Sequence, residues 1–205
     1  QDCLASLSFD HDKSIHIVAD GIGGYDCGEI ASKIVCESYI HGLVNNLSID
    51  EVTKEVSRNI QTECRNLGVS KMGSTVAAVV LNGLQASIFW AGDSRVYVFR
   101  DKHLLYQTED HSLLNELSRV RELSFDEKKR YKHIITRSIM GNADDKVDHD
   151  NLELCFGDEI LICTDGMYNE YPIDYLIESI RMDKLDIEKK NDSFTDNHSF
   201  IYILL

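Results

Sequence analysis

Residues 75–106 read TVAAVVLNGLQASIFWAGDSRVYVFRDKHLLY, and this stretch decides the fold class. It contains runs rich in Val, Ile, Phe, Trp and Tyr, which are side chains that favour β-strands. The runs predict four strands, over residues 75–81, 86–91, 96–99 and 104–106. Because the connections between these runs are short, the strands are expected to pair with antiparallel neighbours.

The rest of the chain comes in blocks of strands or of helices. Further strands are expected at four short apolar runs, over residues 15–19, 152–156, 159–163 and 200–204, of which the middle two read as a hairpin. Helices are expected over residues 29–47, after the capping boxes that begin at Ser48 and Ser124, over residues 112–119 and from Pro172. Strands in runs and helices in pairs favour an α+β fold with antiparallel sheets over alternating βαβ units.

The length and composition fit one globular domain, expected over residues 1–205. The 205 residues are 43% hydrophobic and 27% charged, and no Pro- or Gly-rich linker divides them. No apolar run approaches the ~20 residues that a membrane span needs, and no secretory signal is recognisable. With 35 acidic and 21 basic residues the net charge is −14, which repels phosphate backbones and argues against nucleic acid as a partner.

The six cysteines favour a reducing compartment. None forms a CxxC pair or stands at zinc-finger spacing from a histidine, and most lie in apolar runs. Small buried thiols of this kind are typical of proteins that are kept reduced. We therefore expect buried free thiols and a cytoplasmic location.

Aspartates stand at or just beyond the ends of several expected strands. They are Asp20, Asp93, Asp110, Asp165 and Asp196. Five such acids could meet at one rim of a pair of sheets, where their charges repel one another unless cations neutralise them. Carboxylate and backbone carbonyl oxygens suit hard ions such as Mg²⁺ or Mn²⁺ rather than zinc. A single Asp-Gly or Gly-Asp pair is also a common turn, and Gly157-Asp158 is assigned to a turn without chemistry.

Several longer motifs follow one another in a fixed order along the chain. They are Val18–Gly24 with Gly28–Ser32, Met72–Val76, Ala91–Tyr97, Thr108–Ser112, Ile135–Arg137, Cys163–Met167 and Asp196–Asn197. The sequences and the order of these motifs resemble the signature of the metal-dependent PPM (PP2C-type) protein phosphatases, particularly the bacterial branch. The resemblance runs from Gln1 to Leu204. It implies a sandwich of two antiparallel β-sheets flanked by antiparallel helix pairs (αββα), with a two-metal centre at one edge.

The resemblance also implies a role for each acid around two ions of Mg²⁺ or Mn²⁺. The metal ligands would be Asp20, which bridges both ions, the carbonyl of Gly21, which binds one of them, and Asp165 and Asp196, which bind the other. The surrounding acids would be Asp110 at a third and weaker metal, Asp93, which holds a coordinated water, and Asp2, which acts mainly through water.

The activity implied is hydrolysis of phosphoserine and phosphothreonine in proteins, opposite a Ser/Thr kinase of a bacterial signalling pathway. A water that bridges two metal ions would attack phosphorus in line. Two alternatives stay open at this point. One is a catalytically silent PPM-like domain that binds and regulates a partner, and the other is a metal-dependent hydrolase of small phosphoesters.

The sequence departs from the family at some positions and leaves other residues undecided. It begins inside the family's first motif, so the domain is expected to lack the family's first strand and its phosphate-binding Arg. Ile22 stands where many eukaryotic members carry a His proposed as general acid, which leaves the proton donor unidentified. His111 is interpreted as a base or a helper at the third metal or, preferably, as a polar cap of the following helix. Arg95 and Arg137 are interpreted equally as phosphate contacts or as partners of the acidic rim. Residues 112–133 hold the position of the family's flap, the expected source of substrate selectivity.

Overall fold

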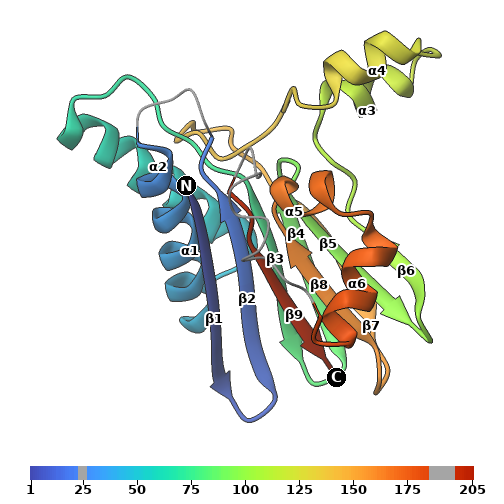
Figure 1. Cartoon of the computed structure of the whole chain (residues 1–205). Helices are drawn as coiled ribbons and strands as arrows, with labels where there is room; N and C mark the ends of the chain where they lie inside the picture. Colours follow the sequence, from blue (N-terminus) through green and yellow to red (C-terminus); the bar gives the residue numbers. More distant parts are fainter. Residues whose placement is uncertain (23–26, 185–196) are drawn as a thin grey trace.

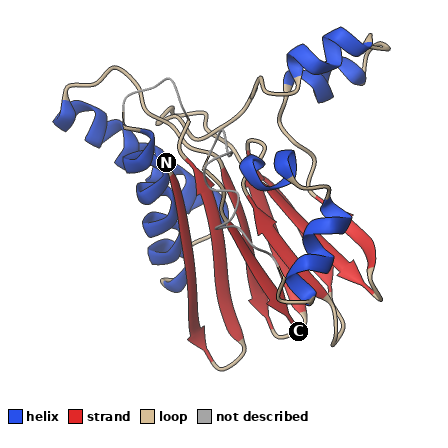
Figure 2. Ribbon diagram, viewed as in Figure 1, coloured by secondary structure: helices blue, strands red, loops and turns tan. Residues whose placement is uncertain are grey.

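The computed structural model, which describes residues 1–22, 27–184 and 197–205, contains two antiparallel β-sheets packed face to face with helices on both outer faces (Figures 1 and 2). The first sheet has the strand order β1 (Asp2–Asp10), β2 (Lys13–Asp20), β3 (Val76–Asn82), β4 (Gln85–Ala91) and β7 (Asp148–Glu153). The second has the order β6 (His103–Gln107), β5 (Arg95–Arg100), β8 (Glu159–Cys163) and β9 (Phe200–Leu204). The expected α+β sandwich of antiparallel sheets is confirmed.

The alternation of side chains along β3 shows why its sequence is apolar throughout. Val76 and Ala78 point to the helices on the outer face, whereas Ala77 and Val79 point to the second sheet. All four side chains are fully buried. A strand that is covered on both faces needs apolar residues at every position rather than at alternate ones. The continuous run at 76–81 therefore encodes a central strand of a layered core.

Helix pairs cover the outer faces of the two sheets. The helices are α1 (Gly28–Val44) and α2 (Ile49–Leu67) on the first sheet, and α5 (Asp165–Glu170) and α6 (Ile173–Arg181) on the second. The expected capping box is present at the start of α2, where Ser48 accepts a hydrogen bond from the backbone N–H of Glu51 and the Glu51 carboxylate accepts one from Ser48. The Tyr39 hydroxyl of α1 lies 2.7 Å from the Thr53 hydroxyl of α2, which joins the two helices inside the core.

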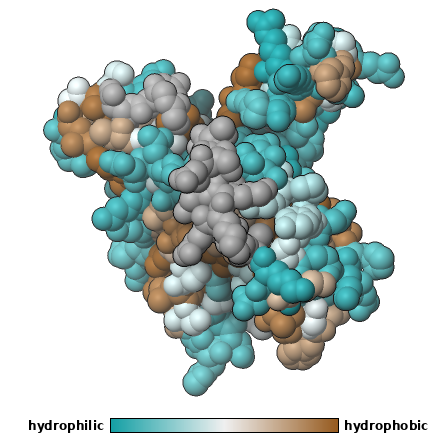
Figure 3. All heavy atoms as spheres, in the orientation of Figure 1, coloured by the Kyte–Doolittle hydropathy of each residue, from teal (hydrophilic) through white to brown (hydrophobic). Residues whose placement is uncertain are grey.

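A second pair of helices, which we call the flap, projects from the body of the molecule (Figure 1). It consists of α3 (Leu113–Ser118) and α4 (Phe125–Tyr131), and every residue of these helices is exposed or half-buried. Its surface in the view of Figure 3 is mostly hydrophilic. The expected capping box at Ser124 is confirmed, with Glu127 as its partner. The flap therefore depends on local hydrogen bonds more than on burial of apolar surface.

The expected hairpin of residues 152–156 and 159–163 is wrong. β7 pairs with β4 in the first sheet, whereas β8 pairs with β5 and β9 in the second. The turn at Gly157, whose φ is +90°, thus carries the chain from one sheet to the other. Two apolar runs separated by a short turn look the same in sequence whether they pair with each other or with different neighbours, because pairing is decided by non-local contacts.

The start of the chain also differs from expectation, because residues 2–10 form an edge strand that the strand analysis did not predict. Cys3, Ala5 and Phe9 pack against the core under α1, while Leu4 and Leu7 stay largely exposed. A register irregularity between Ser8 and Asp10 interrupts the regular alternation near the turn. Because a strand is recognised in sequence by alternating apolar and polar residues, such an irregularity makes the strand hard to predict.

The cysteines are less buried than expected. All six are free thiols, but only Cys36 and Cys163 are buried, and Cys155 is exposed. Trp90 is 6% exposed and lies in the core between the sheets, with its indole N–H donating to the carbonyl of Glu109. Among the described residues, none of the helices is both long and apolar enough to cross a membrane.

Candidate metal centre

The end of β2 is fixed by hydrogen bonds from the neighbouring strand. The backbone N–H of Asp20 donates to the Thr75 hydroxyl at 3.0 Å, and the Asp20 carbonyl accepts from the Thr75 N–H at 2.8 Å and from the Ser74 hydroxyl at 2.9 Å. Asp2 is the register partner of Asp20 on β1. The sheet therefore sets the position of the Asp20 backbone and brings a second acid next to it.

Gly21 has a specific reason to be glycine. A Cβ atom at this position would lie 2.2 Å from the carbonyl oxygen of Gly28, far inside a normal contact. The first turn of α1 thus approaches the end of β2 so closely that no side chain fits between them. The start of β1 is held in the same place, since the Ser32 hydroxyl of α1 donates to the carbonyl of Gln1 at 2.7 Å. Gly21 of the Asp20-Gly21 pair is therefore required for close packing of α1 on β2, in addition to its expected role as a metal ligand.

Asp93 and Asp165 reach the same region from two other parts of the chain. Asp93 follows Gly92, which adopts a φ of +111° and packs against Thr75. The hydroxyl of Tyr168 donates to the Asp93 carbonyl at 2.8 Å. Asp165 is the first residue of α5, and the side-chain amide of Asn169, one turn later, donates to its carboxylate at 3.0 Å. Each acid is therefore oriented by an element that the sheets hold in place.

A cavity of about 270 Å³, which we call the carboxylate cavity, collects these residues. Its walls include Asp20, Gly21, Asp93, His133 and Asp165. Acids that are far apart in the sequence thus meet in one place, which is the convergence that the positions at strand ends predict. Asp196 lies outside the described residues.

The electrostatics of the cavity fit a hard cation. Burial, together with the charges of Asp165 and Asp110, raises the pKa of Asp93 to about 7. One carboxylate oxygen of Asp2, Oδ1, is buried and has no hydrogen-bond partner among the described residues, while its other oxygen accepts from the Thr164 hydroxyl at 3.0 Å. Buried carboxylates that repel each other, and an unpaired oxygen beside them, are groups that a divalent ion would stabilise.

The described residues do not complete a ligand shell alone. Within them, no group of three or more His, Cys, Asp or Glu side chains is arranged so that it could hold a metal ion. The chemistry of the donors nevertheless fits Mg²⁺ or Mn²⁺, because carboxylate oxygens and the Gly21 backbone gather at one cavity and no thiol or imidazole cluster competes with them in the described part of the chain.

Asp110 lies in a neighbouring cavity of about 430 Å³, between the flap and the acids, which we call the flap cavity. Both of its oxygens accept hydrogen bonds from the guanidinium of Arg95 at 2.7 Å. The Arg95 guanidinium also stacks over the ring of Tyr168, 3.6 Å from its centroid. Of the two interpretations of Arg95, the structure therefore shows the pairing with the acidic rim.

His111 does not cap the helix that follows it, so that preferred interpretation is wrong. Ser112 caps α3 instead, accepting from the N–H of Asn115. The Gly92 N–H donates to Nδ1 of His111 at 3.1 Å, which leaves the proton of the neutral ring on Nε2, 3.2 Å from the Asp148 carboxylate. Burial of the ring lowers the pKa of His111. Arg137 forms an ion pair with the same Asp148, which is again a structural pairing.

Sequence reasoning missed residues that position the acids or line the cavities. Thr75 belongs to the Met72–Val76 motif, yet only the structure shows that its hydroxyl and backbone N–H bind the backbone of Asp20. Tyr168 holds the Asp93 carbonyl, and His133 lines both the carboxylate cavity and the flap cavity. His133 has no local signal, because only tertiary contacts bring the end of the flap to the acids.

Comparison with known proteins gives a consistent result. Residues 1–185 match the family model described as protein phosphatase 2C. The serine/threonine phosphatase stp of Listeria monocytogenes is 30% identical over 198 residues, which cover 88% of this chain and 76% of that protein. Among solved structures, the serine/threonine phosphatase of S. agalactiae superposes with a TM-score of 0.74 at 26% identity, over 100% of this chain and 93% of that one. The catalytic domain of the phosphatase PstP, solved in complex with 2 manganese ions, shares the fold with a TM-score of 0.75 at 21% identity, over 98% of this chain and 96% of that one.

Proposed function

Because the chain belongs to the protein phosphatase 2C family, we propose that it hydrolyses phosphoserine and phosphothreonine in proteins with the help of divalent metal ions. The observation that carries the proposal is the convergence of Asp20, Asp93 and Asp165 on the carboxylate cavity. These acids come from the end of β2, the β4–β5 connection and the start of α5. Such a convergence of acids is what metal-assisted phosphoester hydrolysis requires.

The proposed ligands of two Mg²⁺ or Mn²⁺ ions are the carboxylates of Asp20 and Asp165, the carbonyl of Gly21 and Asp196, which lies outside the described residues. Asp93 and Asp2 would act through coordinated water. Asp110 would serve a third ion, in competition with its present pairing with Arg95. When bound, such ions neutralise charge on the phosphoryl oxygens and acidify a water into a nucleophile.

The contribution of the chain's own residues is preorganisation. Thr75 and Ser74 fix the backbone at Asp20, Asn169 orients Asp165, and Tyr168 holds the backbone at Asp93. A site whose charges are already in position avoids a reorganisation cost at the moment of reaction. The hydrogen bonds around the carboxylate cavity would thus contribute to catalysis by holding the acids in position.

The surroundings of the cavity favour a protein substrate over a small phosphoester. The carboxylate cavity shares Asp93, His133 and Asp165 with the flap cavity, and it shares Ile22 and Ile135 with a third cavity of about 550 Å³. A phosphorylated side chain at the acids would therefore have room for its neighbours on both sides. The convergence of the acids speaks against the silent regulatory domain, which needs no such centre.

The proposed setting is the cytoplasm, with a Ser/Thr kinase that phosphorylates the same substrates. The six free thiols support a reducing compartment. The kinase follows from the chemistry, because a phosphatase of proteins needs an enzyme that supplies the phosphoester. Phosphorylated residues can be mapped in the proteins of cells that lack the phosphatase and compared with those of wild-type cells. Residues whose phosphorylation rises without the phosphatase would identify this pathway.

The direct test is phosphate release from a phosphothreonine peptide with Mn²⁺ present and then removed by EDTA. We expect release that stops with EDTA, returns with excess Mn²⁺ and is lost in Asp20→Asn. Asp12→Asn, at the exposed turn between β1 and β2, is the matched control and should keep full activity. EDTA-resistant release, or full turnover by Asp20→Asn, would refute the metal-dependent reaction.

A further inference from the structure

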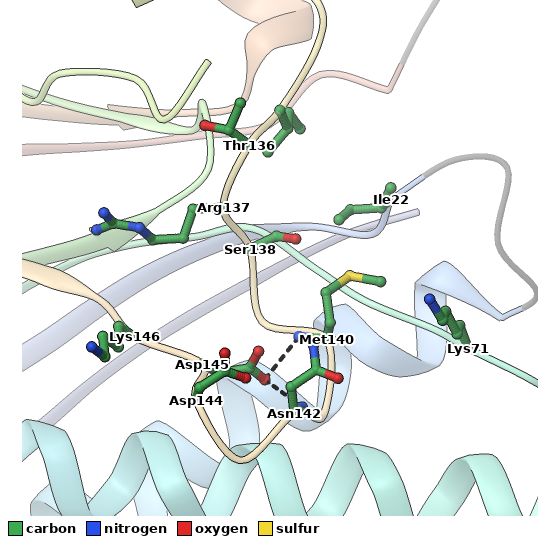
Figure 4. Close-up of a pocket in the computed structure, with 11 residues that line it drawn as sticks. Ile22, Lys71, Thr136, Arg137, Ser138, Met140, Asn142, Asp144, Asp145 and Lys146 are labelled. Atoms are coloured by element: carbon green, nitrogen blue, oxygen red, sulfur yellow. Dashed lines mark hydrogen bonds between the residues drawn. The ribbon is translucent and has the colours of Figure 1, made fainter. Parts of the chain in front are cut away.

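The third cavity, about 550 Å³ in volume, carries positive charge beside the acidic centre. Its walls include Lys71, Arg137 and Lys146, and we call it the cationic cavity (Figure 4). It shares Ile22 and Ile135 with the carboxylate cavity, so the two are direct neighbours. In Figure 4, Lys71 lies on the side of Ile22, whereas Arg137 and Lys146 lie on the opposite side of the chain that crosses the cavity.

The lysines are the charges in this cavity that remain available to a ligand. Neither Lys71 nor Lys146 forms an ion pair with any described residue, and both are exposed. Arg137 is already paired with Asp148.

The acids of the cavity neutralise these lysines only in part. One carboxylate oxygen of Asp145, Oδ2, accepts from the N–H groups of Met140 and Asn142 in its own loop and from the hydroxyl of Ser57 in α2. Asp144 is exposed at the rim of the same cavity. The lining thus has three cations against two acids, and one of the acids, Asp145, already accepts three hydrogen bonds from neutral donors.

The position of these lysines is informative because the chain as a whole has a net charge of −14. A negatively charged segment is repelled by such a surface unless local cations compensate. Lysines without an ion-pair partner among the described residues supply that compensation next to the carboxylate cavity. Consecutive residues of an extended peptide are at most about 3.6 Å apart, so a residue close in sequence to the phosphorylated one can reach an adjoining cavity.

We propose that the cationic cavity binds an anionic group of the substrate, a carboxylate or a second phosphate, close in sequence to the phosphoserine or phosphothreonine that is hydrolysed. Lys71 and Lys146 are the specificity-determining residues. This inference rests on the proposed function, because the carboxylate cavity is taken as the place of the scissile phosphoester. The enzyme then selects acidic or multiply phosphorylated segments of proteins.

The test compares three phosphothreonine peptides of one sequence: a neutral one, one with Asp and Glu beside the phosphothreonine, and one with a second phosphothreonine there. For the wild-type protein we expect kcat/KM to be higher for both anionic peptides than for the neutral one. In the double variant Lys71→Gln/Lys146→Gln this preference should fall by about tenfold, mainly through a higher KM, as expected for the loss of two exposed ion pairs. Added salt should reduce the wild-type preference in the same direction.

The charge-matched control is Lys13→Gln/Lys33→Gln, which removes two lysines that pair with Asp10 and Glu37 on β1 and α1 and should keep the preference unchanged. An equal loss in the control, or a preference that the Lys71/Lys146 variant retains, would overturn the proposal. A loss confined to the doubly phosphorylated peptide would identify a second phosphate as the ligand, and a loss confined to the Asp/Glu peptide would identify carboxylates.

A binding measurement separates this proposal from the proposed function. Fluorescence anisotropy with labelled peptides and the Asp20→Asn variant reports anion binding without turnover. Tighter binding of the anionic peptides, weakened by Lys71→Gln/Lys146→Gln, would support the cationic cavity even if no phosphate were released. If the wild-type protein hydrolysed p-nitrophenyl phosphate but all three peptides bound equally, the phosphatase activity would be supported and the proposed anion binding by the cationic cavity would be refuted.

Discussion

The carboxylate cavity and the flap are built in opposite ways. Asp20 ends β2 and Asp165 begins α5, and the residues just before them, Ala19 and Thr164, are fully buried. Hydrogen bonds with Thr75, just before β3, and with Asn169 within α5 hold the two acids. The flap helices α3 and α4 consist of exposed and half-buried residues and begin at serine caps. A site fixed by sheet register tolerates little change, whereas an element held by local hydrogen bonds can vary without disturbing the centre. The acids of the carboxylate cavity and the flap helices thus belong to parts of the molecule that are held in place by different kinds of contact.

The largest effect expected from this difference is at Gly21. The Cβ of Gly21→Ala would collide with the backbone of Gly28, so α1 or the end of β2 must shift. We expect a loss of about 3 kcal/mol or more in the free energy of unfolding, together with loss of phosphatase activity. Urea unfolding and phosphate release measure the two effects.

Gly83→Ala is the control for this prediction. Gly83 lies in the turn between β3 and β4, with a φ of +58° and open space around it. Strain from the positive φ should cost about 1 kcal/mol and leave activity unchanged. If Gly21→Ala were as mild as Gly83→Ala, the close approach of α1 would not be what fixes the centre.

The next effect is a pH dependence of stability in the metal-free protein. Asp93 has a pKa of about 7 in the folded protein and about 3.8 in the unfolded chain. Between these values the folded state binds the proton more tightly, so the free energy of unfolding falls as the pH rises from about 4 to about 7. The slope from this group is at most about 1.4 kcal/mol per pH unit. Urea unfolding in EDTA should show the decline, and Asp93→Asn should flatten it; an unchanged slope in the variant would assign the decline to other groups.

The third effect compares two arginine–carboxylate pairs. The side chains of Arg95 and Asp110 are 22% and 11% exposed, whereas Arg121 and Glu127 of the flap region pair in a more open setting, at 47% and 32%. Arg95→Met leaves the Asp110 carboxylate without its partner and should cost about 2 kcal/mol in the free energy of unfolding. Arg95→Met/Asp110→Asn should restore part of that loss, and Arg121→Met should change the midpoint little. Equal effects of the two single variants would remove the contrast between the regions.

The same contrast explains how much of the molecule the sequence predicts. Strand β3 was predicted almost residue by residue, because burial on both faces leaves an unbroken apolar run, and β4 was predicted to within one residue although Ser87 interrupts its run. The meeting of Asp20, Asp93 and Asp165 was also predicted, since it follows from strands that end at one rim. Pairing partners were not predictable from local pattern, and neither were contacts such as that of Tyr168 with Asp93. These depend on packing between elements far apart in the sequence.

The smallest expected effect uses one motif that occurs in both kinds of region. Capping boxes begin α2 at Ser48 and α4 at Ser124, each with a glutamate three residues later. Replacing a capping serine by alanine costs a helix about 1 kcal/mol. In Ser48→Ala the cost should appear in global unfolding, because α2 is packed on the first sheet through Val52, Val56 and Ile60.

In Ser124→Ala the same cost should stay within the flap. Amide hydrogen exchange should become faster in α4, while exchange in the strands and the urea midpoint stay as in the wild-type protein. Because the hydrogen bonds described for Asp20, Asp93 and Asp165 come from outside the flap helices, hydrolysis of a small aryl phosphate should also be unchanged. A drop in the urea midpoint equal to that of Ser48→Ala would mean that the flap folds as one unit with the sheets, and the division between a rigid centre and a locally held flap would then be wrong.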